Sequence, residues 1–133
     1  MKLDLSSLEK ALKSLERAAD RSQKEKKDEE VRDAVIQRFE YTYELSWKMM
    51  KRQIEAEAAS PVSVDALGFR DLLREAAEKG FIGDVEAWFE YRDARNRTSH
   101  GYDEKSAQQV YETALRFLKE AKLLLEVLKK RNA

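Results

Sequence analysis

Residues 91–104, YRDARNRTSHGYDE, carry the side chains of this chain that could do chemistry. They include the only histidine, His100, and three arginines stand within the eight residues before it. An arginine can bind a phosphate group through two parallel hydrogen bonds, and an imidazole gains or loses a proton near neutral pH. The segment therefore has the residue types of a site that could bind a phosphodiester.

These polar residues continue the apolar face of a predicted helix. At about 100° per residue, the arc that begins with Val85, Trp88 and Phe89 continues through polar residues. These are Arg92, Arg95, Asn96, Ser99 and His100. Polar groups on a core-facing stripe are costly unless they are paired, so the arc indicates a cleft or a partner surface.

Within this arc, the geometry favours one arrangement around a phosphate. Arg95 and His100 fall at opposite edges with Asn96 between them, and could hold one phosphodiester from two sides. Arg92 and Ser99 are candidate phosphate-binding residues on the same arc. These five residues form the candidate site.

The same spacing also fits an ordinary helix end. A histidine near a helix C-terminus interacts favourably with the helix dipole and the free carbonyl groups. Arg92 and Arg95 could instead pair with carboxylates on a neighbouring helix. Spacing alone leaves both interpretations open.

The rest of the sequence predicts helices that position this segment. Apolar residues recur at helical spacing, and 133 residues with 4 Gly and 1 Pro fit one all-α domain over 1–133. The predicted helices cover about 6–23, 31–57, 69–79, 85–98 or 99, and 104–130. We expect an antiparallel up-and-down four-helix bundle in which 69–79 is a short extra helix, and in which Pro61 breaks the preceding stretch.

Several residues predict where these helices begin and end. Ser6 and Glu9 have the spacing of a capping box at the first helix. Asp28 and Asp84 are expected to cap two further helices. Gly80 is expected just past the end of the helix over 69–79.

Composition narrows the possible functions. The 26 basic and 26 acidic residues balance, so any nucleic-acid contact would be local. The chain has no cysteine, no apolar run near the roughly 18 residues of a membrane helix, and no signal-peptide core. We expect a cytoplasmic protein with no membrane partner and no cofactor. A nucleotidyltransferase acidic pair is not recognisable, so the chain is not expected to transfer nucleotides by itself.

Glu40 and Glu44 lie one turn apart on the predicted helix over 31–57. Spaced carboxylates can bind a metal in a bundle, but no Glu-x-x-His accompanies them, and we expect no metal site. Our hypothesis is that Glu40 or Glu44 orients Arg95 or His100, which requires the two helices to be neighbours.

Three stretches of this sequence resemble a known family. RNRTSH, from Arg95 to His100, resembles the Arg-x4-His motif of HEPN domains, and Tyr102 extends it to Arg-x4-His-x-Tyr. VRDAVIQRFEYTYELSWKMMKRQIE and GFIGDVEAWFEYRDARNRTSHGYDE resemble the two signatures of the nucleotidyltransferase substrate-binding protein branch of HEPN. The resemblance covers nearly the whole chain.

The resemblance implies a HEPN helical bundle that forms a homodimer, with two motifs facing one cleft. It implies a partner, a minimal nucleotidyltransferase encoded nearby. Many such pairs are toxin–antitoxin systems, in which the HEPN toxin is a metal-independent endoribonuclease and the nucleotidyltransferase adenylylates the motif tyrosine. By this resemblance Arg95 would bind the scissile phosphate, His100 would be a general acid or base, Asn96 would orient the site, and Tyr102 would accept AMP.

Two other functions use the same cleft. The chain could be a non-catalytic subunit that binds the substrate or nucleotide for a two-component nucleotidyltransferase. It could also be a structural bundle whose polar patch is an interface. The balanced charge favours these two, because an RNA-binding protein is usually more basic.

Overall fold

The computed structural model describes residues 2–98 and 103–133, and this part of the chain is helical with no strand. The all-α prediction is confirmed. The helices are α1 (Ser6–Lys24), α2 (Glu29–Glu57), α3 (Pro61–Asp65), α4 (Phe69–Glu78), α5 (Val85–Arg97) and α6 (Glu104–Arg131).

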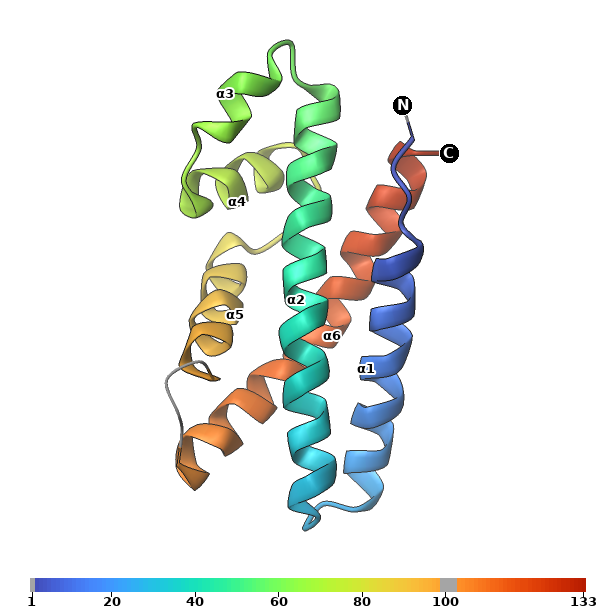
Figure 1. Cartoon of the computed structure of the whole chain (residues 1–133), viewed down its shortest axis with the longest axis vertical. Coiled ribbons are helices and arrows are strands. Elements are labelled where there is room, and N and C mark those ends of the chain that lie inside the picture. The colour runs from blue at the N-terminus through green and yellow to red at the C-terminus, as the bar shows by residue number, and fades with distance from the viewer. Residues whose placement is uncertain (1, 99–102) are drawn as a thin grey trace.

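The long helix α2 lies at the centre and contacts every other helix. In Figure 1, α1, α2, α5 and α6 alternate in direction along the chain, and α1 lies on the other side of α2 from α4 and α5. The short helices α3 and α4 lie beside the C-terminal end of α2. This arrangement places α5, which carries the candidate arginines, directly against α2.

The stretch around Pro61 differs from the prediction. One short helix was expected between 57 and 85, but two are present, since α3 begins at Pro61 itself. Ser60 before it is extended, as a residue preceding proline prefers. Proline is well tolerated at the first position of a helix because its missing N–H would have had no partner there.

An aromatic cluster joins three helices in the core. The ring of Phe117 on α6 lies 5.1 Å from Phe39 and 6.2 Å from Tyr43 of α2, centroid to centroid. It also lies 5.6 Å from Trp88 and 5.2 Å from Tyr91 of α5. Offset and edge-to-face pairs of this kind stabilise a core beyond their buried area.

The predicted caps at the helix termini are confirmed in part. Asp28 accepts hydrogen bonds from two backbone N–H groups of α2, and Asp84 accepts one from α5, so both predicted caps are confirmed. The capping box at α1 is wrong. Ser6 already lies inside the helix, and its backbone N–H and its hydroxyl donate to the Asp4 carboxylate instead.

Gly80 ends α4 as predicted. Its φ is 81°, and the N–H of Phe81 donates to the carbonyl of Ala76 at 2.9 Å, which closes a Schellman turn. This turn directs the chain from α4 back toward the start of α5.

No helix among residues 2–98 and 103–133 is long and apolar enough to cross a membrane.

Gly80→Ala tests the left-handed turn. A left-handed residue with a Cβ costs about 1–2 kcal/mol, partly offset by lower entropy of the unfolded chain. We expect the free energy of unfolding, measured with urea, to fall by about 1 kcal/mol.

Gly83→Ala is the matched control, since neither glycine has an atom within 4 Å of an added Cβ, but Gly83 has no positive φ. Its unfolding free energy is expected to stay the same or rise. Equal losses in both variants would contradict this account of the turn.

Candidate functional site

Three helices surround an open pocket of about 190 Å³. Helix α2 supplies one wall, the last two turns of α5 supply another, and α4 contributes one ring. The lining residues are Tyr43, Glu44, Trp47, Phe69, Arg92, Arg95 and Asn96. The three candidate residues of α5 that the structure describes thus face one pocket.

Arg95 and Glu44 link the two walls. The Arg95 Nε atom lies 3.2 Å from Glu44 Oε1, and the side chains are 26% and 44% exposed. The two helices are neighbours, as the hypothesis on Glu40 and Glu44 requires, and Glu44 forms an ion pair with Arg95. Glu40, one turn earlier on α2, does not line the pocket.

Arg92 approaches the pocket differently. Its guanidinium carbon lies 3.2 Å from the centroid of the Phe69 ring, a cation–π contact. Among the described residues no carboxylate forms an ion pair with it. Arg97 is exposed on another side of α5 and donates to Gln109 at 3.4 Å.

Ser99, His100 and Tyr102 lie outside the described residues. The chain on either side of them is described, because α5 ends at Arg97 and α6 begins at Glu104. Asn96 is the last lining residue of the pocket before this stretch.

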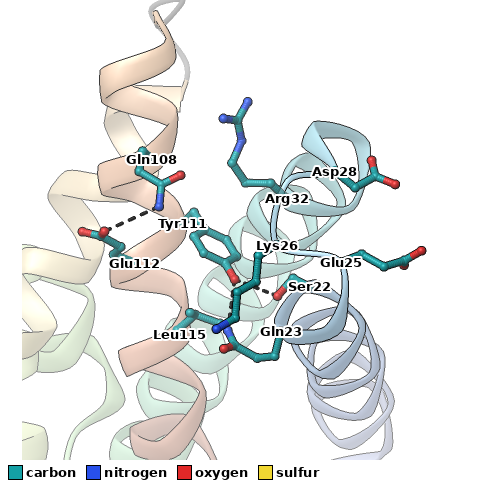
Figure 2. Close-up of a pocket in the computed structure, with 10 residues that line it drawn as sticks. All are labelled: Ser22, Gln23, Glu25, Lys26, Asp28, Arg32, Gln108, Tyr111, Glu112 and Leu115. Atoms are coloured by element: carbon teal, nitrogen blue, oxygen red, sulfur yellow. Dashed lines mark hydrogen bonds between the residues drawn. The ribbon is translucent and has the colours of Figure 1, made fainter.

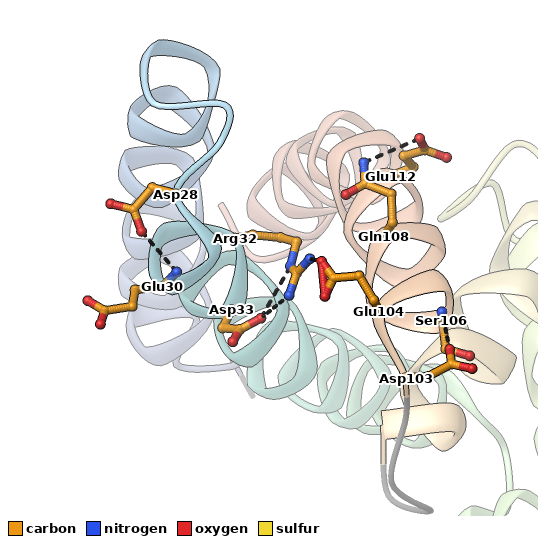
Figure 3. Close-up of polar contacts among 9 residues, drawn as sticks. All are labelled: Asp28, Glu30, Arg32, Asp33, Asp103, Glu104, Ser106, Gln108 and Glu112. Atoms are coloured by element: carbon orange, nitrogen blue, oxygen red, sulfur yellow. Dashed lines mark hydrogen bonds and ion pairs between the residues drawn. The ribbon is translucent and has the colours of Figure 1, made fainter.

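The start of α6 has a cap of its own and an ion pair to α2. Asp103 accepts a hydrogen bond from the Ser106 backbone at 2.9 Å, which lowers the pKa of the Asp103 carboxyl. Arg32 of α2 forms ion pairs with Glu104 and, at 3.2 Å, with Asp33 (Figure 3). Sequence reasoning did not find Arg32, because nothing in its spacing relates it to a residue 72 positions away.

Tyr43 lies in the wall of the pocket with its hydroxyl buried. Burial raises the pKa of this phenol strongly, and the nearby charges of Arg92 and Arg95 only partly oppose that shift. The hydroxyl is therefore neutral at physiological pH, and Tyr43 cannot serve as a base in the pocket. It makes no hydrogen bond to another described residue.

A second pocket, of about 290 Å³, lies between the α1–α2 turn and α6 (Figure 2). The Tyr111 hydroxyl at its base hydrogen-bonds to Ser22 at 2.8 Å and to Gln23 at 3.1 Å. Its rim carries charges of both signs, from Glu25, Lys26 and other residues. Because the polar groups at its base already bond to one another, it offers a ligand less than the arginine-lined pocket does.

Metal-ligand types do not cluster in the part of the chain that the structure describes. Within residues 2–98 and 103–133, no three His, Cys, Asp or Glu side chains come together as metal ligands would. Glu40 and Glu44 thus belong to no such group there.

Residues 3–130 match the family described as nucleotidyltransferase substrate binding protein like. The chain belongs to this family. The HEPN branch predicted from the sequence signatures is thereby confirmed.

Similar proteins of known sequence and of known structure support this family assignment. A Haemophilus influenzae protein named "Probable ribonuclease HepT" is 45% identical over 139 residues, covering 98% of this chain and 95% of that protein. A solved Haemophilus influenzae structure, described as revealing the fold of a substrate binding domain of a nucleotidyltransferase, has a TM-score of 0.85 at 42% identity, over 95% of this chain and 99% of its own. A crystal structure of a Thermus thermophilus protein has a TM-score of 0.70 at 28% identity, over 91% of this chain and 98% of its own.

The Glu44–Arg95 pair is expected to orient Arg95 without stabilising the fold much. Both side chains are partly exposed, and such pairs contribute about 0.2–1 kcal/mol. We expect a double-mutant cycle of Glu44→Gln and Arg95→Gln, measured by urea unfolding, to give a coupling energy below about 1 kcal/mol. A coupling well above that value would mean that the pair holds α5 against α2.

Proposed function

We propose that this protein is a HEPN-type endoribonuclease that works without a metal ion. The observation that carries the proposal is the pocket that Arg92, Arg95 and Asn96 line together with Glu44, which pairs with Arg95. The three α5 residues stand shortly before His100 in the chain. The relative named as a probable ribonuclease, 45% identical over nearly the whole chain, supports it.

Each residue has a role in this proposal. Arg95, oriented by Glu44, binds the scissile phosphate and stabilises the charge that develops on it. His100 transfers a proton to or from the reacting oxygens. The ribose 2′-oxygen attacks phosphorus, the bond to the 5′-oxygen breaks, and that oxygen leaves with a proton. Asn96 orients the site by hydrogen bonding, and Arg92 and Ser99 provide further phosphate contacts.

A homodimer is part of the proposal. The reaction needs a base at the 2′-oxygen and an acid at the 5′-oxygen, and the chain has one histidine. Two copies that face one cleft would supply both groups.

We further propose that the protein is the toxin of a toxin–antitoxin pair with a small nucleotidyltransferase. The Tyr102 phenolic oxygen would attack the α-phosphate of ATP in the partner, pyrophosphate would leave, and AMP would remain on Tyr102. The added negative charge would compete with RNA phosphate for Arg95, so the modified protein would be inactive.

RNA cleavage by the purified protein in EDTA tests the enzyme. We expect the unmodified protein, verified by intact mass, to cleave single-stranded RNA. His100→Ala and Arg95→Ala are each expected to lower the rate by about 100-fold or more. The control Arg17→Gln, on the exposed side of α1, should cleave like the wild type.

Cleavage that EDTA abolishes, or that survives both substitutions, would contradict the proposed mechanism. A protein carrying AMP on Tyr102 should be inactive until the AMP is removed.

The second candidate is a non-catalytic subunit that binds the substrate or nucleotide of a two-component nucleotidyltransferase. The Haemophilus influenzae structure described as a substrate binding domain favours it, and so does the zero net charge. It predicts that the unmodified dimer binds a nucleotide at Arg95 but leaves RNA intact.

A further inference from the structure

Arginine and phenylalanine side chains alternate from the candidate pocket onto α4. Arg92 packs on Phe69 at 3.2 Å, guanidinium carbon to ring centroid. Arg70 lies 5.3 Å from Phe69 and 4.9 Å from Phe89, and Arg74 lies 5.8 Å from Phe89. These five residues are termed the arginine track. It begins at the candidate pocket, because Arg92 and Phe69 line both.

The guanidinium charges of the track are largely not neutralised by carboxylates of the described residues. Among residues 2–98 and 103–133, no carboxylate forms an ion pair with Arg70 or Arg92. Arg74 pairs with Asp71 at 3.3 Å, but both side chains are more than half exposed, so the pair is weak and open to exchange. Two to three guanidinium groups are thus available to an anion.

Packing on the rings prepares these arginines to bind phosphate. A guanidinium stacked on an aromatic ring has less side-chain freedom to lose, and its N–H groups can still form a two-pronged contact with an anion. Because guanidinium groups already occupy the neighbourhood of the Phe69 and Phe89 rings, few faces remain on which a base could stack. Such a surface contacts the nucleic-acid backbone and does not read its sequence.

We infer that the arginine track binds the phosphates of RNA next to the scissile one, so that α4 extends the candidate site by one or two nucleotides. This inference rests on the proposed function. Continuity with the Arg92–Arg95 pocket favours RNA over an acidic protein surface, because one strand would pass from the track into that pocket. The track also supplies the local basic surface that a chain of zero net charge needs to hold RNA.

Binding measured against salt separates phosphate contacts from mere packing of α4 on α5. Affinity for a labelled, mixed-sequence single-stranded RNA is measured at several NaCl concentrations in the His100→Ala protein, in which cleavage is expected to be at least about 100-fold slower. Each phosphate contact contributes about 0.7 to the slope of log affinity on log salt for single strands. We expect Arg70→Gln to lower that slope by about 0.7 and to weaken binding about tenfold at low salt.

Three variants are the controls. Arg70→Lys keeps the charge and should restore most of the slope. Arg74→Gln should lower the slope less than Arg70→Gln, because Asp71 already pairs with Arg74. Arg17→Gln removes an exposed arginine on α1, on the other side of α2 from α4 (Figure 1), and should leave the slope unchanged. Urea midpoints of all variants verify that each is folded.

Three other results would overturn the inference. RNA binding whose slope is the same in Arg70→Gln and Arg17→Gln overturns the arginine track and leaves the proposed function standing. If Arg70→Gln instead disrupts only the complex with the co-expressed nucleotidyltransferase, the track is a protein interface and the inference is wrong. If the unmodified wild type neither cleaves nor binds RNA, the proposed function fails and the inference fails with it.

Discussion

The ring of Phe117 is the contact on which the candidate site depends most. It is fully buried on α6 and meets Trp88 and Tyr91 of α5 edge-on, at 75° and 78°, and Phe39 of α2 at 81°. A third helix therefore fixes the separation of α2 from α5. The arginines of α5 and Glu44 of α2 line opposite walls of one pocket, so the width of that pocket is set in the aromatic core.

The sequence was sufficient for the regular parts of this fold. Helical periodicity, the carboxylates of Asp28 and Asp84, and Gly80 each act through local backbone geometry, which a single sequence displays. The sequence was insufficient where more than one local structure was compatible with the same residues. Asp4 accepts the backbone N–H of Ser6, the first residue of α1, and Pro61 starts a helix where we expected a break.

The same division holds at the site. The phase of α5 predicted that Arg92, Arg95 and Asn96 face one side, and the pocket contains all three. The choice between Glu40 and Glu44 could not be made, because it depends on how far α5 slides along α2. Likewise, the packing of Arg70 near both Phe69 and Phe89 follows from the approach of α4 to α5, which no local pattern encodes.

On either side of the segment that holds His100 and Tyr102, one residue pairs with α2: Arg95 before it pairs with Glu44, and Glu104 after it pairs with Arg32. When both ends of a connecting segment lie beside one helix, lengthening the segment costs little, about 0.6 kcal/mol for each doubling of its length. Its chemistry is far less tolerant, since a reacting group displaced by about 1 Å can lose two orders of magnitude in rate. The free energy of folding of this protein should therefore depend little on changes in its motif. Variants that have lost the motif's chemistry would remain stable, well-folded proteins.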